Sequence, residues 1–222
     1  MRFPNAAVGV KRIYIGEVLA LFASIAVGIG LILGFATTEG AANGDVAAIV
    51  DTAFNPLAWL VITTASIGGI ALIVAWIINL IGVYNASKDE ESFKAALYLI
   101  IIGIVASLLG SILSQNVLLS QIFSVASSVV SLLTTLMIIA GISNLAMQLG
   151  NQAVQEKGQN IVKLIIITLA VSILIKLVLA IFRGSFGTAI AVVLAIFAVL
   201  LELAQLVIYL SFLNQANKML NS

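Results

Sequence analysis

The stretch that decides the fold class of this chain is Ala95–Gln155, AALYLIIIGIVASLLGSILSQNVLLSQIFSVASSVVSLLTTLMIIAGISNLAMQLGNQAVQ, which contains no charged side chain. A transmembrane helix needs roughly 20 mostly apolar residues to cross about 30 Å of hydrocarbon. The stretch is too long for one crossing, and Ser114-Gln115-Asn116 is the polar break well inside it. We therefore predict two membrane-spanning helices joined by a tight turn. The runs lack the apolar/polar alternation of barrel strands, which argues against a transmembrane barrel.

The composition of the whole chain agrees with this interpretation. Of the 222 residues, 62% are hydrophobic and 9% are charged, whereas soluble domains have about 45–50% and about 25%. The mean hydropathy is +1.23. These values exclude an ordinary soluble domain and a disordered chain, and they indicate an integral membrane protein.

Six stretches are long and apolar enough to span a bilayer, and they predict an all-α integral membrane bundle of six transmembrane helices arranged as three helical hairpins. We expect residues 1–222 to form one transmembrane domain. The N-terminus has the basic residues of a signal peptide, but its apolar run exceeds the usual length of about 7–15 residues, so we expect a retained helix. The predicted spans are about 13–36, 57–84, 93–113, 118–145, 161–182 and 186–210.

The distribution of basic residues predicts the orientation, because Lys and Arg favour cytoplasmic loops. Of the ten Lys and Arg residues, eight fall on one side of the predicted bundle, whereas Arg183 falls on the other and Lys176 lies inside a span. We expect a cytoplasmic (plasma) membrane protein with both termini in the cytoplasm. The eight are Arg2, Lys11, Arg12, Lys88, Lys94, Lys157, Lys163 and Lys218.

The first external loop, residues 37–55, is the longest predicted loop. Apolar residues recur at helical spacing between Val46 and Phe54, with Asp45 as an N-cap and Pro56 after them. This pattern predicts a short amphipathic helix on the outer leaflet, which would cover the bundle or act as a lid.

Small residues recur along three predicted spans, and such residues let helix backbones approach each other in lipid. We expect them to make contacts within the chain, with a homodimer face as the alternative. They are Ala26, Gly30 and Gly34; Ala65, Gly68 and Gly69; and Gly103, Ala106, Ser107 and Gly110.

The fourth predicted span carries a face of hydroxyl side chains. Ser124, Ser128, Ser131 and Thr135 share one side of the helix. Hydroxyls can bond back to their own helix, so this face is compatible with packing in lipid. The alternative is that it lines a polar path.

Ionisable residues inside the spans predict a second polar site. Such residues are costly in hydrocarbon and usually find a partner. Lys176 and Glu202 lie on neighbouring antiparallel helices at heights that permit an ion pair, although each could instead be accommodated without the other. Gln205 and Tyr209 extend a stripe from Glu202, and Glu17 could join it.

The sequence offers no catalytic, cofactor or metal site. The chain contains no His and no Cys, which removes thiolate and imidazole chemistry and most transition-metal sites. A P-loop and a dinucleotide fingerprint are both absent, and Glu90 and Glu91 are predicted to be a solvated helix start. With a net charge of +1, no strong field attracts a nucleic acid. We therefore expect no enzyme, no cofactor and no nucleic-acid partner.

The stretch Tyr84–Tyr98, YNASKDEESFKAALY, resembles a recurrent feature of small uncharacterised prokaryotic polytopic membrane proteins. In these, a Ser/Lys/Asp loop followed by an aromatic and a small residue opens the next helix. The segment Asn5–Arg12, followed by Tyr14 and Glu17, is of the same type. Size and span number are also similar to substrate-binding subunits of energy-coupling vitamin transporters, although the alanine motif of their first helix is not matched.

Two functions from different classes remain open on this sequence. The first is a non-enzymatic scaffold or accessory subunit that acts through protein–protein contacts in the membrane. The second is a small-solute transporter or the substrate-binding subunit of one, supported by the few intramembrane charges and the hydroxyl face. The expected partners are the lipid bilayer and either other membrane proteins or further copies of this chain.

Overall fold

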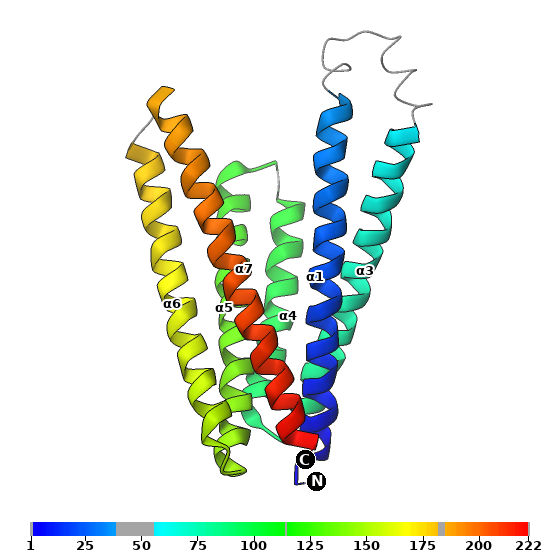
Figure 1. The fold of residues 1–222 in the computed structure, drawn as a ribbon, viewed down its shortest axis with the longest axis vertical. Coiled ribbons are helices and arrows are strands. Elements are labelled where there is room, and N and C mark those ends of the chain that lie inside the picture. Colours follow the sequence, from blue (N-terminus) through cyan, green and yellow to red (C-terminus); the bar gives the residue numbers. More distant parts are fainter. Residues whose placement is uncertain (1, 39–55, 114, 182–184, 222) are drawn as a thin grey trace. The chain divides into compact units, whose positions relative to one another are not determined.

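The computed structural model describes residues 2–38, 56–113, 115–181 and 185–221, and every regular element in these ranges is an α-helix (Figure 1). The all-α prediction is therefore confirmed for the described residues. The predicted amphipathic helix of residues 46–54 lies outside them. The helices are α1 (Pro4–Thr38), α3 (Pro56–Ala86), α4 (Glu91–Ile112), α5 (Val117–Gln148), α6 (Gln152–Ile181) and α7 (Ser185–Asn221).

Four described helical segments are long and apolar enough to cross a membrane. They have mean hydropathies between 2.0 and 2.4, as expected for segments that must satisfy their backbone hydrogen bonds internally in lipid. The chain is a helical membrane protein on this criterion of length and composition. The segments are Pro4–Gly30, Leu60–Ala86, Glu91–Ile112 and Val125–Gln148.

The helix starts follow from local chemistry. The chain's two prolines, Pro4 and Pro56, are the first residues of α1 and α3, where the missing N–H is not needed and the fixed φ suits a helix. Asn116 caps α5, since its side chain accepts a hydrogen bond from Leu119 N at 3.2 Å. Asn151 caps α6 in the same way by accepting from Val154 N at 3.2 Å.

The end of α5 is set by Gly150, which has φ of 70°. A residue with a Cβ rarely adopts this left-handed conformation. Gly150 N donates to Met147 O at 3.1 Å, and Asn151 N donates to Ala146 O at 2.8 Å. These two bonds are those of a Schellman motif, and they allow α6 to begin at once with the opposite direction.

The chain divides into two compact units. One comprises Arg12–Gly82 and is called the α1–α3 unit; the other comprises residues 1–11 with 83–222 and is called the four-helix unit. In the α1–α3 unit the two helices run antiparallel and touch at glycines. A Cβ at Gly16 would lie 3.0 Å from Ala75 O and 3.2 Å from Asn79 N. The backbones of α1 and α3 are therefore in close contact at this point.

Two further glycines repeat this contact along the same pair of helices. A Cβ at Gly68 would meet Val27 Cγ2 at 2.7 Å and Ala23 O at 3.1 Å, and a Cβ at Gly30 would meet Ala65 N at 3.3 Å. The predicted intramolecular packing is confirmed for Gly30 and Gly68 and is wrong for Gly69, where a Cβ would meet nothing within 4 Å.

In the four-helix unit, α4 and α5 form a hairpin that is also packed on small residues. A Cβ at Gly103 would lie 3.3 Å from Val130 Cγ1, and one at Gly110 would lie 3.2 Å from Phe123 Cβ. The hydroxyls of Ser107 and Ser127 are 2.8 Å apart and share a hydrogen bond. These residues of α4 therefore pack within the chain, as predicted.

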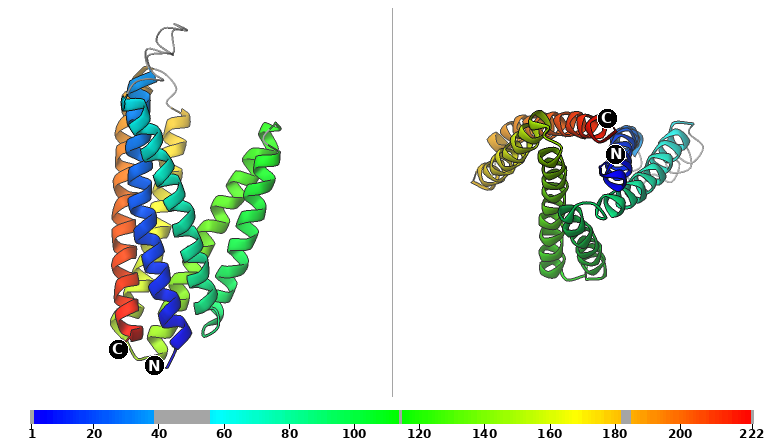
Figure 2. Two further views of the ribbon diagram at one scale, coloured as in Figure 1. Left: turned by 90° about the vertical axis from the view of Figure 1, so that its right-hand side faces the viewer. Right: turned by 90° about the horizontal axis from the view of Figure 1, so that it is seen from below.

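In the four-helix unit α4 packs against α5, α5 against α6 and α6 against α7. The α4–α5 hairpin diverges from the α6–α7 pair with distance from the α5–α6 connection (Figure 2). The fully buried side chains of this unit include Val10, Val83, Phe93, Ile139, Ile142, Leu145, Ile161, Phe212 and Leu213.

Candidate functional site

A cluster of polar side chains, here called the polar clasp, joins three helix ends in the four-helix unit. It consists of Asn5, Asp89, Glu90, Ser92 and Asn144. The connection between α3 and α4 supplies its two carboxylates, because successive N–H groups bond back from Ser87 N to Val83 O and from Glu90 N to Ala86 O. Asp89 and Glu90 are adjacent in this tight turn, but their side chains bind different helices: Asp89 binds α1 and Glu90 binds α5.

Asp89 binds the first turn of α1. One carboxylate oxygen accepts from Asn5 Nδ2 at 2.9 Å, and the other accepts from Ala6 N at 2.8 Å. The N-terminal N–H groups of a helix lack intrahelical partners and carry partial positive charge. A carboxylate is therefore well suited to cap α1, and this one comes from a distant part of the chain.

Glu90 binds α5. Its Oε1 accepts from Asn144 Nδ2 at 2.9 Å and from Ser92 Oγ at 3.1 Å. Both Glu90 and Asn144 are half-buried, whereas Glu91 is exposed. Glu90 and Glu91 stand at the start of α4, as predicted. Glu91 is solvated, whereas Glu90 is only partly so, because folding brings the amide of Asn144 beside its carboxylate.

Close packing lies beneath the clasp. A Cβ at Gly141 would be 2.7 Å from the ring of Phe93, and a Cβ at Gly158 would overlap the hydroxyl of Ser143 and lie 3.3 Å from the ring of Phe212. The two phenylalanine rings are fully buried. Glycines thus let α4 approach α5, and let α6 approach both α5 and α7.

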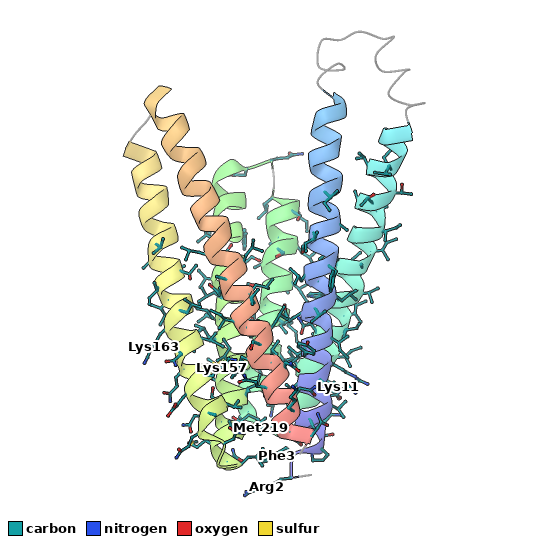
Figure 3. The ribbon with its side chains drawn as sticks, in the orientation of Figure 1. Arg2, Phe3, Lys11, Lys157, Lys163 and Met219 are labelled. Carbon is teal, nitrogen blue, oxygen red and sulfur yellow. The ribbon has the colours of Figure 1, made fainter. Side chains whose placement is uncertain are left out.

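Basic side chains surround this end of the four-helix unit. Arg2 Nη1 donates to Gln148 O at the end of α5 at 3.1 Å, and Lys157 Nζ donates to Ser211 Oγ at 2.9 Å. Figure 3 shows that Arg2, Lys11 and Lys157 lie in the same half of the unit. Positive charge therefore gathers at the clasp end.

A second polar site lies inside the α1–α3 unit. Asn79 Nδ2 donates to Glu17 Oε1 at 2.7 Å, and the contact of Gly16 with the backbone of α3 brings the two side chains together. The other polar atom of this amide, Asn79 Oδ1, is buried without a hydrogen-bond partner. Both residues belong to segments that are long and apolar enough to cross a membrane.

The structure places the predicted polar stripe as follows. Glu17 contacts Asn79 of α3, which lies outside the predicted stripe. Tyr209 is buried and Gln205 is half-buried on α7. The side chains of Lys176 and Glu202 lie outside the described residues, so their ion pair stays a prediction.

On the hydroxyl face of α5, Thr135 bonds back to its own helix. Thr135 Oγ1 donates to Ser131 O at 3.2 Å, and Ser128 and Ser131 are exposed. The side chain of Ser124 lies outside the described residues. Back-bonding of this kind is what packing in lipid requires, while a path along this face stays a prediction.

Of the two missed residues Asn79 and Asp89, only Asn79 carries a signal in the sequence. Asn79 is the strongly polar residue inside an otherwise apolar span, and it lies about as far inside the predicted span 57–84 as Glu17 lies inside the predicted span 13–36. Asp89 lies in a loop, where a carboxylate is usually solvated, so its sequence context does not distinguish it.

Among the described residues, no group of three or more acidic side chains could hold a metal ion together. No family model, no curated protein and no solved structure matches this chain.

Proposed function

We propose that this chain is a non-enzymatic membrane protein that acts as a scaffold or accessory subunit through contacts with other membrane proteins. In this proposal six helices span the cytoplasmic membrane as three hairpins, with both termini in the cytoplasm. The gathering of Arg2, Lys11 and Lys157 at the clasp end supports that orientation. At 30 and 37 residues, α6 and α7 have the length that two further spans need.

The observation that carries the proposal is one apolar face of α4. Its side chains recur every three or four residues and are exposed, and Ile112 is the most exposed of them at 74%. Such a face would meet lipid or the transmembrane helix of a partner. The face consists of Tyr98, Ile101, Ile102, Val105, Leu108, Leu109 and Ile112.

Site-specific photocrosslinking tests this proposal. A photoreactive amino acid at Val105 should give a protein adduct in native membranes, identifiable by mass spectrometry. A matched probe at Ile73 of α3, which is also exposed and apolar, controls for random collisions. Lipid adducts alone at both positions would contradict the scaffold proposal.

A second candidate function is transport of a small solute, which the Glu17–Asn79 pair favours. Ionisable residues inside spans often belong to substrate or ion pathways. The hydroxyl face of α5 is the candidate for such a path. If solute passes along it, Ser131→Cys and Thr135→Cys should react with a small water-soluble thiol reagent in intact membranes. Protection of both, with Gln115→Cys labelled as a control, would argue against transport along this face.

A further inference from the structure

The side-chain amide of Asn79 lacks one hydrogen bond, and a proton on a neighbouring group would supply it. A side-chain amide has two N–H donors and one carbonyl acceptor. One donor binds Glu17 Oε1 at 2.7 Å, but Asn79 Oδ1 is buried without a partner. A buried acceptor without a donor is costly, so a native structure usually supplies one.

The Glu17 carboxyl group is already hydrogen-bonded to this amide, at Asn79 Nδ2. An ionised carboxylate only accepts hydrogen bonds, whereas a protonated carboxyl has an O–H to donate. The same conclusion holds for the amide in its other orientation, because Asn79 Oδ1 would then lie 2.7 Å from Glu17 Oε1. Two acceptors at that distance need a proton between them.

The surroundings of Glu17 favour the neutral form. Along the helix, at about 1.5 Å per residue, Glu17 lies about 8 Å beyond Arg12, and Asn79 lies about 10 Å before the end of α3 at Ala86. Helix α3 contains no charged residue. On α1 the titratable neighbours are Lys11, Arg12 and Tyr14; the two basic side chains are exposed and Tyr14 is half-buried. Residues three or four positions apart share a helix face. Arg12 lies five positions before Glu17, so the two side chains leave α1 on different faces.

We propose that Glu17 is an intramembrane proton-binding site, whose protonated carboxyl group exchanges two hydrogen bonds with the side-chain amide of Asn79. The carbonyl oxygen of the acid accepts from Asn79 Nδ2, and its O–H donates to Asn79 Oδ1. The ligand of this site is a single proton, and its release would leave the amide oxygen unpaired again. The site is independent of the scaffold function proposed above.

Infrared spectroscopy of the full chain in lipid nanodiscs at neutral pH tests this directly. The wild-type protein should show the C=O band of a protonated carboxyl group, shifted by exchange into D2O. Glu17→Gln should abolish that band. Glu156→Gln removes an exposed carboxyl group on α6 and should leave the band unchanged. A wild-type spectrum without a band that depends on Glu17 would overturn the proposal.

Thermal stability provides a second readout. Glu17→Gln keeps a carbonyl acceptor and adds an N–H donor, so it can make both bonds to Asn79 and should keep the wild-type Tm. Glu17→Leu strands both groups of the amide and should lower the Tm, and Asn79→Leu in the same chain should restore part of the loss. A Tm of Glu17→Gln as low as that of Glu17→Leu would show that the charge is needed, against the proposal.

A chemical test on the wild-type chain does not depend on any variant folding. Hydrophobic carbodiimides react with protonated carboxyl groups within membranes, because the acid must deliver its proton to the carbodiimide nitrogen as its oxygen adds to the central carbon. Peptide mass spectrometry should find the adduct on Glu17 at neutral pH, with less at alkaline pH. Adducts confined to other carboxyl groups would count against a neutral Glu17.

Discussion

The carboxylate of Asp89 accepts a hydrogen bond from the backbone N–H of Ala6 at 2.8 Å. A residue of the connection between α3 and α4 thereby caps the start of α1, although the two residues are 83 positions apart in the chain. Asn5 Nδ2 binds the second oxygen of the same carboxylate at 2.9 Å. One side chain thus caps α1 and holds its first turn beside the start of α4.

Asp89→Ala should loosen the first turn of α1. Loss of a helix cap typically costs about 0.5–2 kcal/mol, and the lost charge also stabilised the helix dipole. We expect a lower Tm in detergent and faster amide hydrogen exchange at Ala6. Glu91→Ala is the matched control, because Glu91 is an exposed acid two positions after Asp89, at the first residue of α4. Equal effects of the two changes would contradict the capping role of Asp89.

Gly158→Ala should destabilise the contact between α5 and α6. The new methyl group would overlap the hydroxyl of Ser143, which donates to Ile139 O at 2.9 Å. Overpacking of this kind typically costs about 1–3 kcal/mol. Thermal unfolding in detergent measures the effect.

Two variants sharpen this test. Ser143→Ala removes the atom that the methyl group meets, so adding it to Gly158→Ala should recover part of the lost stability. A Cβ at Gly69 meets nothing within 4 Å, so Gly69→Ala should keep or raise the Tm through its better helix propensity. If Gly158→Ala is as stable as Gly69→Ala, the close approach of α5 and α6 is wrong.

The proposed topology predicts which introduced cysteines face the outside of the cell. The chain has no cysteine of its own, so single cysteines can be placed freely. An impermeant maleimide should label positions 40, 115 and 185 in intact cells and leave positions 87, 155 and 222 unlabelled. The reverse pattern would refute the orientation, and failure at position 115 alone would refute two of the six spans.

A double-mutant cycle tests the predicted ion pair of Lys176 and Glu202. If they pair, Lys176→Leu or Glu202→Leu alone strands a charge and should lower the Tm more than the double change does. Unfolding in detergent of the wild type, both single variants and the double variant completes the cycle. Losses that simply add would discard the pair.

The helical membrane class followed from local features of the chain. A long run without charges, such as Ala95–Gln155, has few alternatives to helices that satisfy their own backbone hydrogen bonds. Small residues at helical spacing also identified part of the packing, including Gly30 against Ala65. Hydropathy placed the first span at residue 13, whereas α1 begins at Pro4, because a capped helix can continue through polar residues.

Only the tertiary structure decided which polar groups meet. From the sequence alone, Glu17 was a candidate member of the stripe that extends from Glu202, and Glu90 was a solvated acid. In the structure α3 brings Asn79 to Glu17, and α5 brings Asn144 to Glu90. These partners lie far apart in the chain, and their meeting depends on how each helix is rotated about its axis and where glycines such as Gly16 and Gly158 allow close approach. Hydrogen bonds act only over short distances, so the composition of each helix determines that it spans, and the contacts between helices determine its polar sites.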